Sequence, residues 1–261
     1  MGKAQDAVRA VGSYVALGDS FTEGYGDYYS DGSCQGWADR FARQLAAADP
    51  ALTYANLAIR GKLLRQVLAE QVQVAVALKP DLISLAAGGN DLLRPGADPD
   101  ALADTFERAV VQLTAAGGQV LLFSGFDPSG LPLMRLIRGK CIVFNARIKD
   151  IARRHDCLHV DLWSMAVLAD PRHWCADRLH LAPDGHRRVA LHVAETIGLP
   201  VSEDWREPLA LDVAAAPGWT RSRRQDLRWA RTYAAPWIQR RLKGVSSGDG
   251  LPPKRPDLLP L

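Results

Sequence analysis

Apolar runs alternate with helical spacings of apolar residues along the first 198 residues of the chain. Runs that predict buried strands lie at residues 14–18, 52–58, 81–87, 119–123 and 158–163. Apolar positions at helical spacing predict helices over residues 36–48, 63–78, 100–116, 133–154 and 183–197. Strands this apolar along their whole length are covered on both faces, as in a parallel sheet. The alternation therefore predicts a three-layer α/β/α domain.

Short polar or glycine-containing segments follow several of the predicted strands. They are 18–20 (Gly-Asp-Ser), 60–61 (Arg-Gly), 89–91 (Gly-Asn-Asp) and 177–180 (Asp-Arg-Leu-His). In parallel sheets, ligands bind outside the carboxyl ends of the strands, on the loops that lead into helices. We expect the four segments to meet at this edge and to form one site.

Ser20 and His180 have the residue types needed for nucleophilic catalysis. A serine hydroxyl is a weak nucleophile until a neighbouring base takes its proton, and His180 is the candidate base. Asp177, three residues earlier, can accept a hydrogen bond from the other imidazole nitrogen. Asp184 competes with Asp177 for this role.

Hydrogen-bond donors for a tetrahedral intermediate are also available near the predicted edge. They are the backbone N–H groups of Ser20 and Gly61 and the carboxamide of Asn90, and a glycine at 61 would let a substrate come close. Each residue has a purely structural alternative. Ser20 could be a turn cap, Gly61 a turn glycine and Asn90 a helix cap.

Together, the four segments resemble the four ordered blocks of the SGNH, or GDSL-type, serine hydrolases, over residues 14–198. The resemblance implies a flavodoxin-like parallel sheet and catalysis on esters or thioesters without a cofactor or metal. It also implies Ser20 as nucleophile, His180 as base, Asp177 as its partner, and Ser20, Gly61 and Asn90 as oxyanion donors. The serine does not lie in the G-x-S-x-G turn of α/β-hydrolases.

We therefore expect a serine esterase or lipase that cleaves a small-molecule acyl ester through an acyl-enzyme intermediate. One alternative keeps the site but acts as an acyltransferase or a carbohydrate deacetylase. Another is a non-catalytic binding module that uses a basic C-terminal helix for a membrane or another partner. The acyl chain length and the oligomeric state are not encoded in these motifs.

Composition and charge narrow the range of partners and compartments. Residues 199–261 contain 11 of the 32 Lys and Arg but only 7 of the 29 Asp and Glu, so the main body is almost neutral and nucleic acid is not expected as a partner. Residues 1–11 lack the apolar region of a secretory signal, and no apolar run is long enough for a membrane helix, which predicts a cytoplasmic protein. The four cysteines have no zinc-site spacing.

The basic C-terminal part of the chain predicts an extension to a hydrolase domain that spans residues 1–200. In residues 201–243, Trp229, Tyr233 and Trp237 recur every four residues among arginines, which predicts a helix that packs its aromatic face on the main domain. The alternatives are contact of this helix with an anionic membrane surface and dimerisation through it. We expect Pro236 to bend or end the helix and residues 244–261 to form a disordered tail.

Overall fold

A computed structural model describes residues 11–130, 134–210, 224, 226–242 and 245–261. At its centre lies a six-stranded sheet with the order β5-β4-β3-β1-β2-β6. The first five strands are parallel: β1 (Ser13–Gly18), β2 (Thr53–Asn56), β3 (Leu82–Ala86), β4 (Gln119–Ser124) and β5 (Leu158–Asp161). The order 2-1-3-4-5 is that of flavodoxin-like folds, so the predicted fold class is confirmed.

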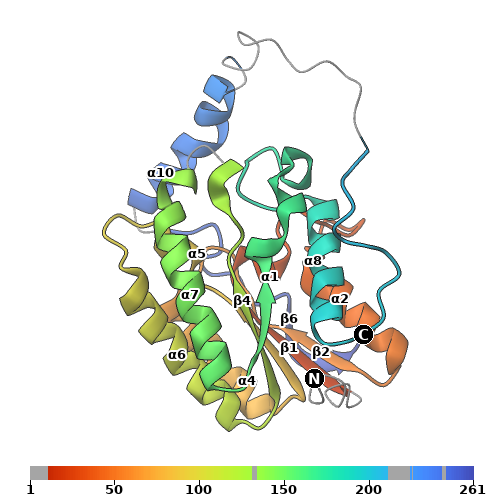
Figure 1. Cartoon of the computed structure of the whole chain (residues 1–261). Coiled ribbons are helices and arrows are strands. Elements are labelled where there is room, and N and C mark those ends of the chain that lie inside the picture. Colours follow the sequence, from red (N-terminus) through yellow and green to blue (C-terminus); the bar gives the residue numbers. More distant parts are fainter. Residues whose placement is uncertain (1–10, 131–133, 211–223, 225, 243–244) are drawn as a thin grey trace.

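Helices cover both faces of this sheet (Figure 1). α2 (Gly36–Ala48) and α8 (Pro183–Thr196) pack together on one face. The other face carries the helical run of α3 (Leu64–Val67), the π-helical segment Leu68–Val72 and α4 (Gln73–Leu78), followed by α6 (Pro99–Ala115) and α7 (Arg138–Arg154). Two separate apolar cores result, and every residue of β3 is buried, as the apolar run 81–87 predicts.

The predicted helices and strands recur with end points shifted by a few residues. The helix of residues 133–154 is an exception at its start, because Met134–Ile137 form a 3₁₀ turn before α7 begins at Arg138. Short helices also follow two strands, namely α1 (Ser20–Glu23) after β1 and α5 (Gly89–Leu92) after β3. Both begin in the polar segments expected to form the site.

The expected disordered tail is wrong for residues 245–261. β6 (Arg255–Pro260) pairs antiparallel with β2 and forms an edge of the sheet. The Lys254 ammonium group lies 2.8 Å from the Asp39 carboxylate and donates hydrogen bonds to the carbonyls of Cys34 and Gln35. Two contacts order this segment, although its composition alone suggests disorder. They are the pairing of β6 with the edge strand β2 and the largely buried ammonium group of Lys254.

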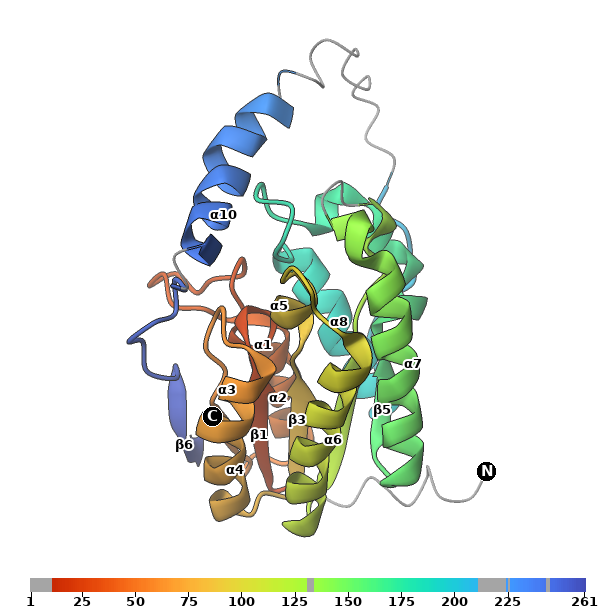
Figure 2. The same ribbon diagram turned by 90° about the vertical axis from the view of Figure 1, so that its left-hand side faces the viewer.

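The basic helix of residues 226–242 rises beyond the carboxyl ends of the strands (Figures 1 and 2). The helix continues past Pro236: a π-helical turn at Ala230–Ala234 is followed by α10 (Ala235–Leu242). Proline has no N–H to donate to the preceding turn, and a π-turn, which shifts the hydrogen-bond pattern, is one way for a helix to continue despite this. Trp229 contacts the main body and Tyr233 is 38% exposed. The side chain of Trp237 lies outside the described residues, so the packing of the whole aromatic face stays a prediction.

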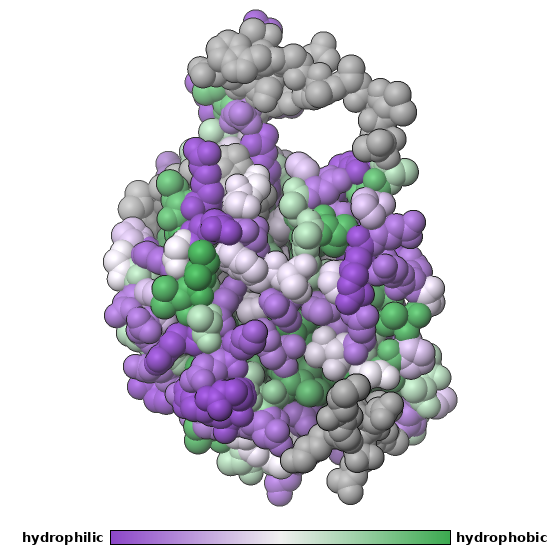
Figure 3. Space-filling view, in the orientation of Figure 1, coloured by the Kyte–Doolittle hydropathy of each residue, from purple (hydrophilic) through white to green (hydrophobic). Residues whose placement is uncertain are grey.

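Hydrophilic residues cover most of the face shown in Figure 3, with apolar residues in separate groups. No helix among the described residues is long and apolar enough to cross a membrane. Residues 211–223 and 243–244, which belong to the predicted extension and tail, lie outside the described residues. The boundary of the hydrolase domain at residue 200 stays a prediction.

Candidate active site

Ser20 begins α1 directly after β1, in a loop that buried polar groups hold in place. The Asp19 side chain accepts a hydrogen bond from the N–H of Phe21 at 3.2 Å and caps the helix. Behind it, the buried amide of Gln71 bonds both backbone groups of Gly18, each at 2.9 Å. Gln71 lies in the π-helical segment, a feature that often marks functional sites. The turn that presents the serine is thereby fixed from two sides.

His180 lies between Ser20 and Asp177. Its Nε2 is 3.2 Å from the Ser20 Oγ, and its Nδ1 is 2.7 Å from Asp177 Oδ2. The second Asp177 oxygen accepts the N–H groups of Leu179 and His180. Burial alone would raise the pKa of Asp177, but these hydrogen bonds and the nearby imidazole lower it below its usual value. The carboxylate therefore favours the imidazole tautomer with the proton on Nδ1, which leaves Nε2 free to accept the serine proton.

Asp184, the competitor for the partner role, does not contact His180. Its carboxylate lies 2.9 Å from His173 Nδ1 and 2.8 Å from the Arg188 guanidinium group. It sits in the first turn of α8. Asp177 is thus the carboxylate that the structure brings to His180.

Asn90 links the serine loop to the loop of Gly61. The Asn90 Nδ2 donates to the Asp19 carboxylate at 3.0 Å and to the Lys62 carbonyl at 3.2 Å, which ties three loops together. Among the described residues, no backbone hydrogen bond uses the N–H of Ser20 or Gly61. All five residues predicted for the site, Ser20, Gly61, Asn90, Asp177 and His180, belong to loops that converge here.

Asp19 is a buried acid beside the serine, and its pKa is unusually high. Its side chain is buried, and burial raises its pKa to about 6, although the N–H of Phe21 and the nearby His180 oppose this change. In the sequence, Asp19 is only a member of the polar segment 18–20, without an expected role of its own. Its position directly before the candidate nucleophile was the available signal.

A buried ion pair supports the loop of Gly61. The guanidinium group and the backbone N–H of Arg60 both bond the carboxylate of Glu23, which is 7% exposed. The guanidinium carbon lies 4.6 Å from the centre of the Tyr25 ring, and that ring is in turn 4.6 Å from the imidazole of His180. The roles of Glu23 and Arg60 were not predicted, because their pairing joins two loops that are distant in the sequence.

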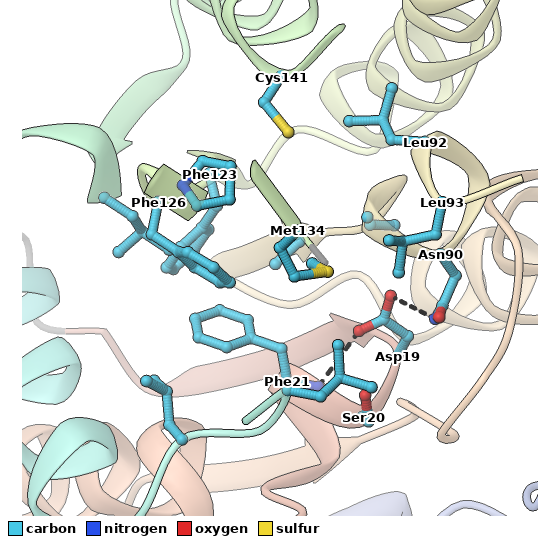
Figure 4. A pocket seen from close by; sticks show the side chains of 18 of the residues that line it. Asp19, Ser20, Phe21, Asn90, Leu92, Leu93, Phe123, Phe126, Met134 and Cys141 are labelled. Atoms are coloured by element: carbon cyan, nitrogen blue, oxygen red, sulfur yellow. Dashed lines mark hydrogen bonds between the residues drawn. The ribbon is translucent and has the colours of Figure 1, made fainter. Parts of the chain in front are cut away.

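A cavity of about 160 Å³ opens beside Ser20. Figure 4 shows Ser20 and Asn90 at one end, Cys141 of α7 at the opposite end and Met134 between them. Phe21, Phe123 and Phe126 line one side, and Leu92 and Leu93 the other (Figure 4). Apart from the groups at the mouth, most of this lining is apolar, which suits a hydrocarbon chain attached to a carbonyl at Ser20.

Comparisons with known proteins identify the family. The model of the GDSL-like lipase/acylhydrolase family matches residues 16–188. The chain belongs to this family. It is a carboxylic ester hydrolase, and the expected family and enzyme class are confirmed.

Solved structures agree with the acylhydrolase fold. LAE5, an α/β hydrolase enzyme from the metagenome of Lake Arreo, is 22% identical with a TM-score of 0.62, over 72% of this chain and 95% of its own. TesA is 24% identical with a TM-score of 0.61, over 71% and 98%. The acetylxylan esterase Axe2 from Geobacillus stearothermophilus is 22% identical with a TM-score of 0.58, over 75% and 96%. At these identities the likeness shows the fold, and no curated protein matches the chain.

No group of three His, Cys, Asp or Glu side chains arranged to hold a metal ion occurs within the part of the chain that the structure describes.

Proposed function

We propose that this acylhydrolase cleaves esters of a medium-length acyl chain, with Ser20 as nucleophile, His180 as base and Asp177 as the group that orients His180. The observation that carries the proposal is the unbroken line Ser20 Oγ–His180 Nε2 (3.2 Å) and His180 Nδ1–Asp177 Oδ2 (2.7 Å) at the mouth of an apolar cavity.

The first half-reaction forms an acyl-enzyme. The Ser20 oxygen attacks the ester carbonyl carbon while its proton passes to His180 Nε2, and the new imidazolium is stabilised by the Asp177 carboxylate. The carbonyl oxygen becomes an oxyanion that accepts hydrogen bonds from the N–H groups of Ser20 and Gly61. When the C–O bond of the ester breaks, the imidazolium returns its proton to the departing alkoxide.

The second half-reaction uses water in the place of the alcohol. His180 takes a proton from the water, the resulting hydroxide attacks the acyl carbon, and the Ser20 oxygen leaves with the proton from His180. Asn90 becomes the third oxyanion donor when its planar carboxamide rotates as a unit, so that Nδ2 exchanges its hydrogen bond to the Lys62 carbonyl for one to the substrate oxygen.

The cavity sets the acyl chain length. A cavity of roughly 150 Å³ lined by aliphatic and phenyl groups holds a six-carbon ring, so about six acyl carbons fit the 160 Å³ beside Ser20. Burial of each methylene group there contributes about 0.8 kcal/mol. An acetyl group, the kind that the name of the acetylxylan esterase Axe2 implies, would leave most of the space empty.

A panel of p-nitrophenyl esters tests both parts of the proposal. We expect kcat/KM to rise from acetate through butyrate to hexanoate or octanoate and then to fall for laurate, while Ser20→Ala abolishes turnover. A fluorophosphonate probe should label Ser20 and only weakly label His180→Ala, measured by mass spectrometry of the intact protein.

Other outcomes favour the alternatives. A maximum at acetate would support a carbohydrate deacetylase, and ester formation in excess of hydrolysis with added sugars or alcohols would support an acyltransferase. Absence of both turnover and a Ser20 adduct would contradict the proposal and favour a binding module.

A further inference from the structure

Residues 226–242 and 245–261, here called the C-terminal arm, contact the loops on both sides of Ser20. The arm lies outside the match to the family model, which ends at residue 188. About three quarters of this chain aligns with almost the whole length of each of the three compared structures.

Ser246 of the arm holds the peptide group between Arg60 and Gly61. Its hydroxyl donates to the Arg60 carbonyl oxygen at 3.2 Å, while the N–H of Arg60 donates to Glu23 at 2.7 Å. The Arg60 carbonyl and the Gly61 N–H belong to one planar amide, so an oxygen fixed at one end fixes the direction of the N–H at the other. A hydrogen bond to the carbonyl also polarises the amide and strengthens its N–H as a donor.

The fit between this part of the arm and the loop is close. Gly61 has a φ of 76°, and a Cβ on it would overlap the Ser246 hydroxyl. A Cβ on Gly248 would overlap the Arg60 carbonyl oxygen. Glycine at 61 thus makes room for Ser246, whereas the sequence suggested that it makes room for the substrate.

The helical part of the arm rests on the loop that carries the other catalytic groups. The indole N–H of Trp229 donates to the backbone carbonyl of Asp177 at 2.9 Å. The next residue, Arg178, lies over the Trp229 ring and pairs with Asp226 at 2.7 Å. Arg178 has a φ of 56°, an uncommon backbone conformation for a residue with a side chain. The contacts with the arm therefore support a strained position between Asp177 and His180.

We propose that two residues of the C-terminal arm, Ser246 and Trp229, position catalytic groups of the active site. Ser246 positions the Gly61 N–H toward the oxyanion, and Trp229 positions Asp177 and, through it, His180. This inference rests on the proposed function, in which Gly61 is an oxyanion donor and Asp177 orients the base. Residues outside the family domain thereby affect the rate of the chemical step.

Ser246→Ala tests the first contact, with Ser247→Ala as the matched control, because Ser247 is an exposed neighbour of the same type. Turnover is divided by the active sites titrated with a fluorophosphonate. Since misplacing one donor costs up to about a hundredfold, we expect Ser246→Ala to lower kcat about ten- to a hundredfold with KM within about twofold. Affinity for a trifluoromethyl ketone, which forms an oxyanion on Ser20, should fall by a similar factor. Ser247→Ala should match the parent protein in all three.

Trp229→Phe tests the second contact, because it removes the N–H donor and keeps a smaller aromatic ring in the place of the indole beside Arg178. Tyr233→Phe, one turn further along the helix, is its control. We expect Trp229→Phe to lower kcat about tenfold and to shift the acidic limb of the kcat–pH profile, while Tyr233→Phe changes neither.

Two results would overturn the inference. One is a kcat per titrated site equal to that of the parent protein in both Ser246→Ala and Trp229→Phe. The other is a loss of activity that follows only the number of titratable sites and the melting temperature. Ser20→Ala is measured in parallel: turnover that survives it would refute the proposed function, and the inference with it, whereas an inactive Ser20→Ala with unaffected arm variants refutes the inference alone.

Discussion

The buried carboxyl group of Asp19 predicts a stability that decreases as the pH rises. Burial raises the pKa of Asp19 from 3.8 to about 6. Between these values the folded protein holds a proton that the unfolded chain has released, and above about 6 the folded protein must ionise a buried acid. The stability linked to this proton is therefore present at low pH and is lost as the pH rises through 6.

The size of the effect follows from the two pKa values. A difference of about two units corresponds to roughly 3 kcal/mol over the full range, of which about 1.4 kcal/mol falls between pH 5 and pH 8. In Asp19→Asn the side chain cannot ionise, so this contribution disappears. We expect the variant to gain about 1.4 kcal/mol relative to the parent protein when the pH is raised from 5 to 8, whatever constant difference the substitution adds.

Urea unfolding of both proteins at several pH values between 5 and 8 measures this change. The m-values should agree, so that the midpoints report stability alone. A difference in unfolding free energy between Asp19→Asn and the parent that stays constant over this range would refute the argument. A difference that grows toward low pH would mean that the sign is wrong.

Three further predictions concern the cavity, the serine loop and the acid limit of stability. Cys141→Trp should fill the far end of the cavity and shift the best p-nitrophenyl ester to butyrate or acetate, whereas an unchanged optimum at hexanoate would place the acyl chain elsewhere. Gln71→Leu should lower the unfolding free energy in urea by about 2–5 kcal/mol, because it leaves both buried backbone groups of Gly18 without partners; a loss below 1 kcal/mol would contradict this role. Burial lowers the pKa of His186 to about 4, so the stability contributed by its neutral imidazole is complete above pH 6.5, and about 3 kcal/mol is lost as the pH falls to 4. His186→Asn should weaken this acid dependence of the unfolding free energy in urea titrations. An identical slope would exclude His186 as its source.

The alternating pattern of the sequence was sufficient for the five parallel strands and their helices. β3 and β4 are recognisable because they are apolar throughout, and α8 because Pro183 opens a regular helical spacing. The site loops were predictable for a related reason. In a parallel sheet, motifs that follow different strands must meet at one edge, so Ser20 and Asn90 could be placed together without knowledge of any distance.

Features that depend on contacts between distant segments could not be predicted. β6 contains two prolines and two charged residues among its six residues, and it is a strand because β2 offers an unpaired edge. The raised pKa of Asp19 depends on burial, which no local pattern encodes. Nor does the sequence show that Ser246 lies against Gly61, since 185 positions separate them and only the folded chain brings them into contact.

The strand β6 also affects how molecules of this protein meet one another. The parallel order would otherwise end on β2, whose free backbone groups could recruit a strand from a second molecule and begin aggregation. Instead the outermost strand carries Pro256 and Pro260, which have no N–H to donate. A strand from a neighbouring molecule would therefore meet an edge that lacks some of its hydrogen-bond donors. The same residues that complete the sheet thus also discourage its growth.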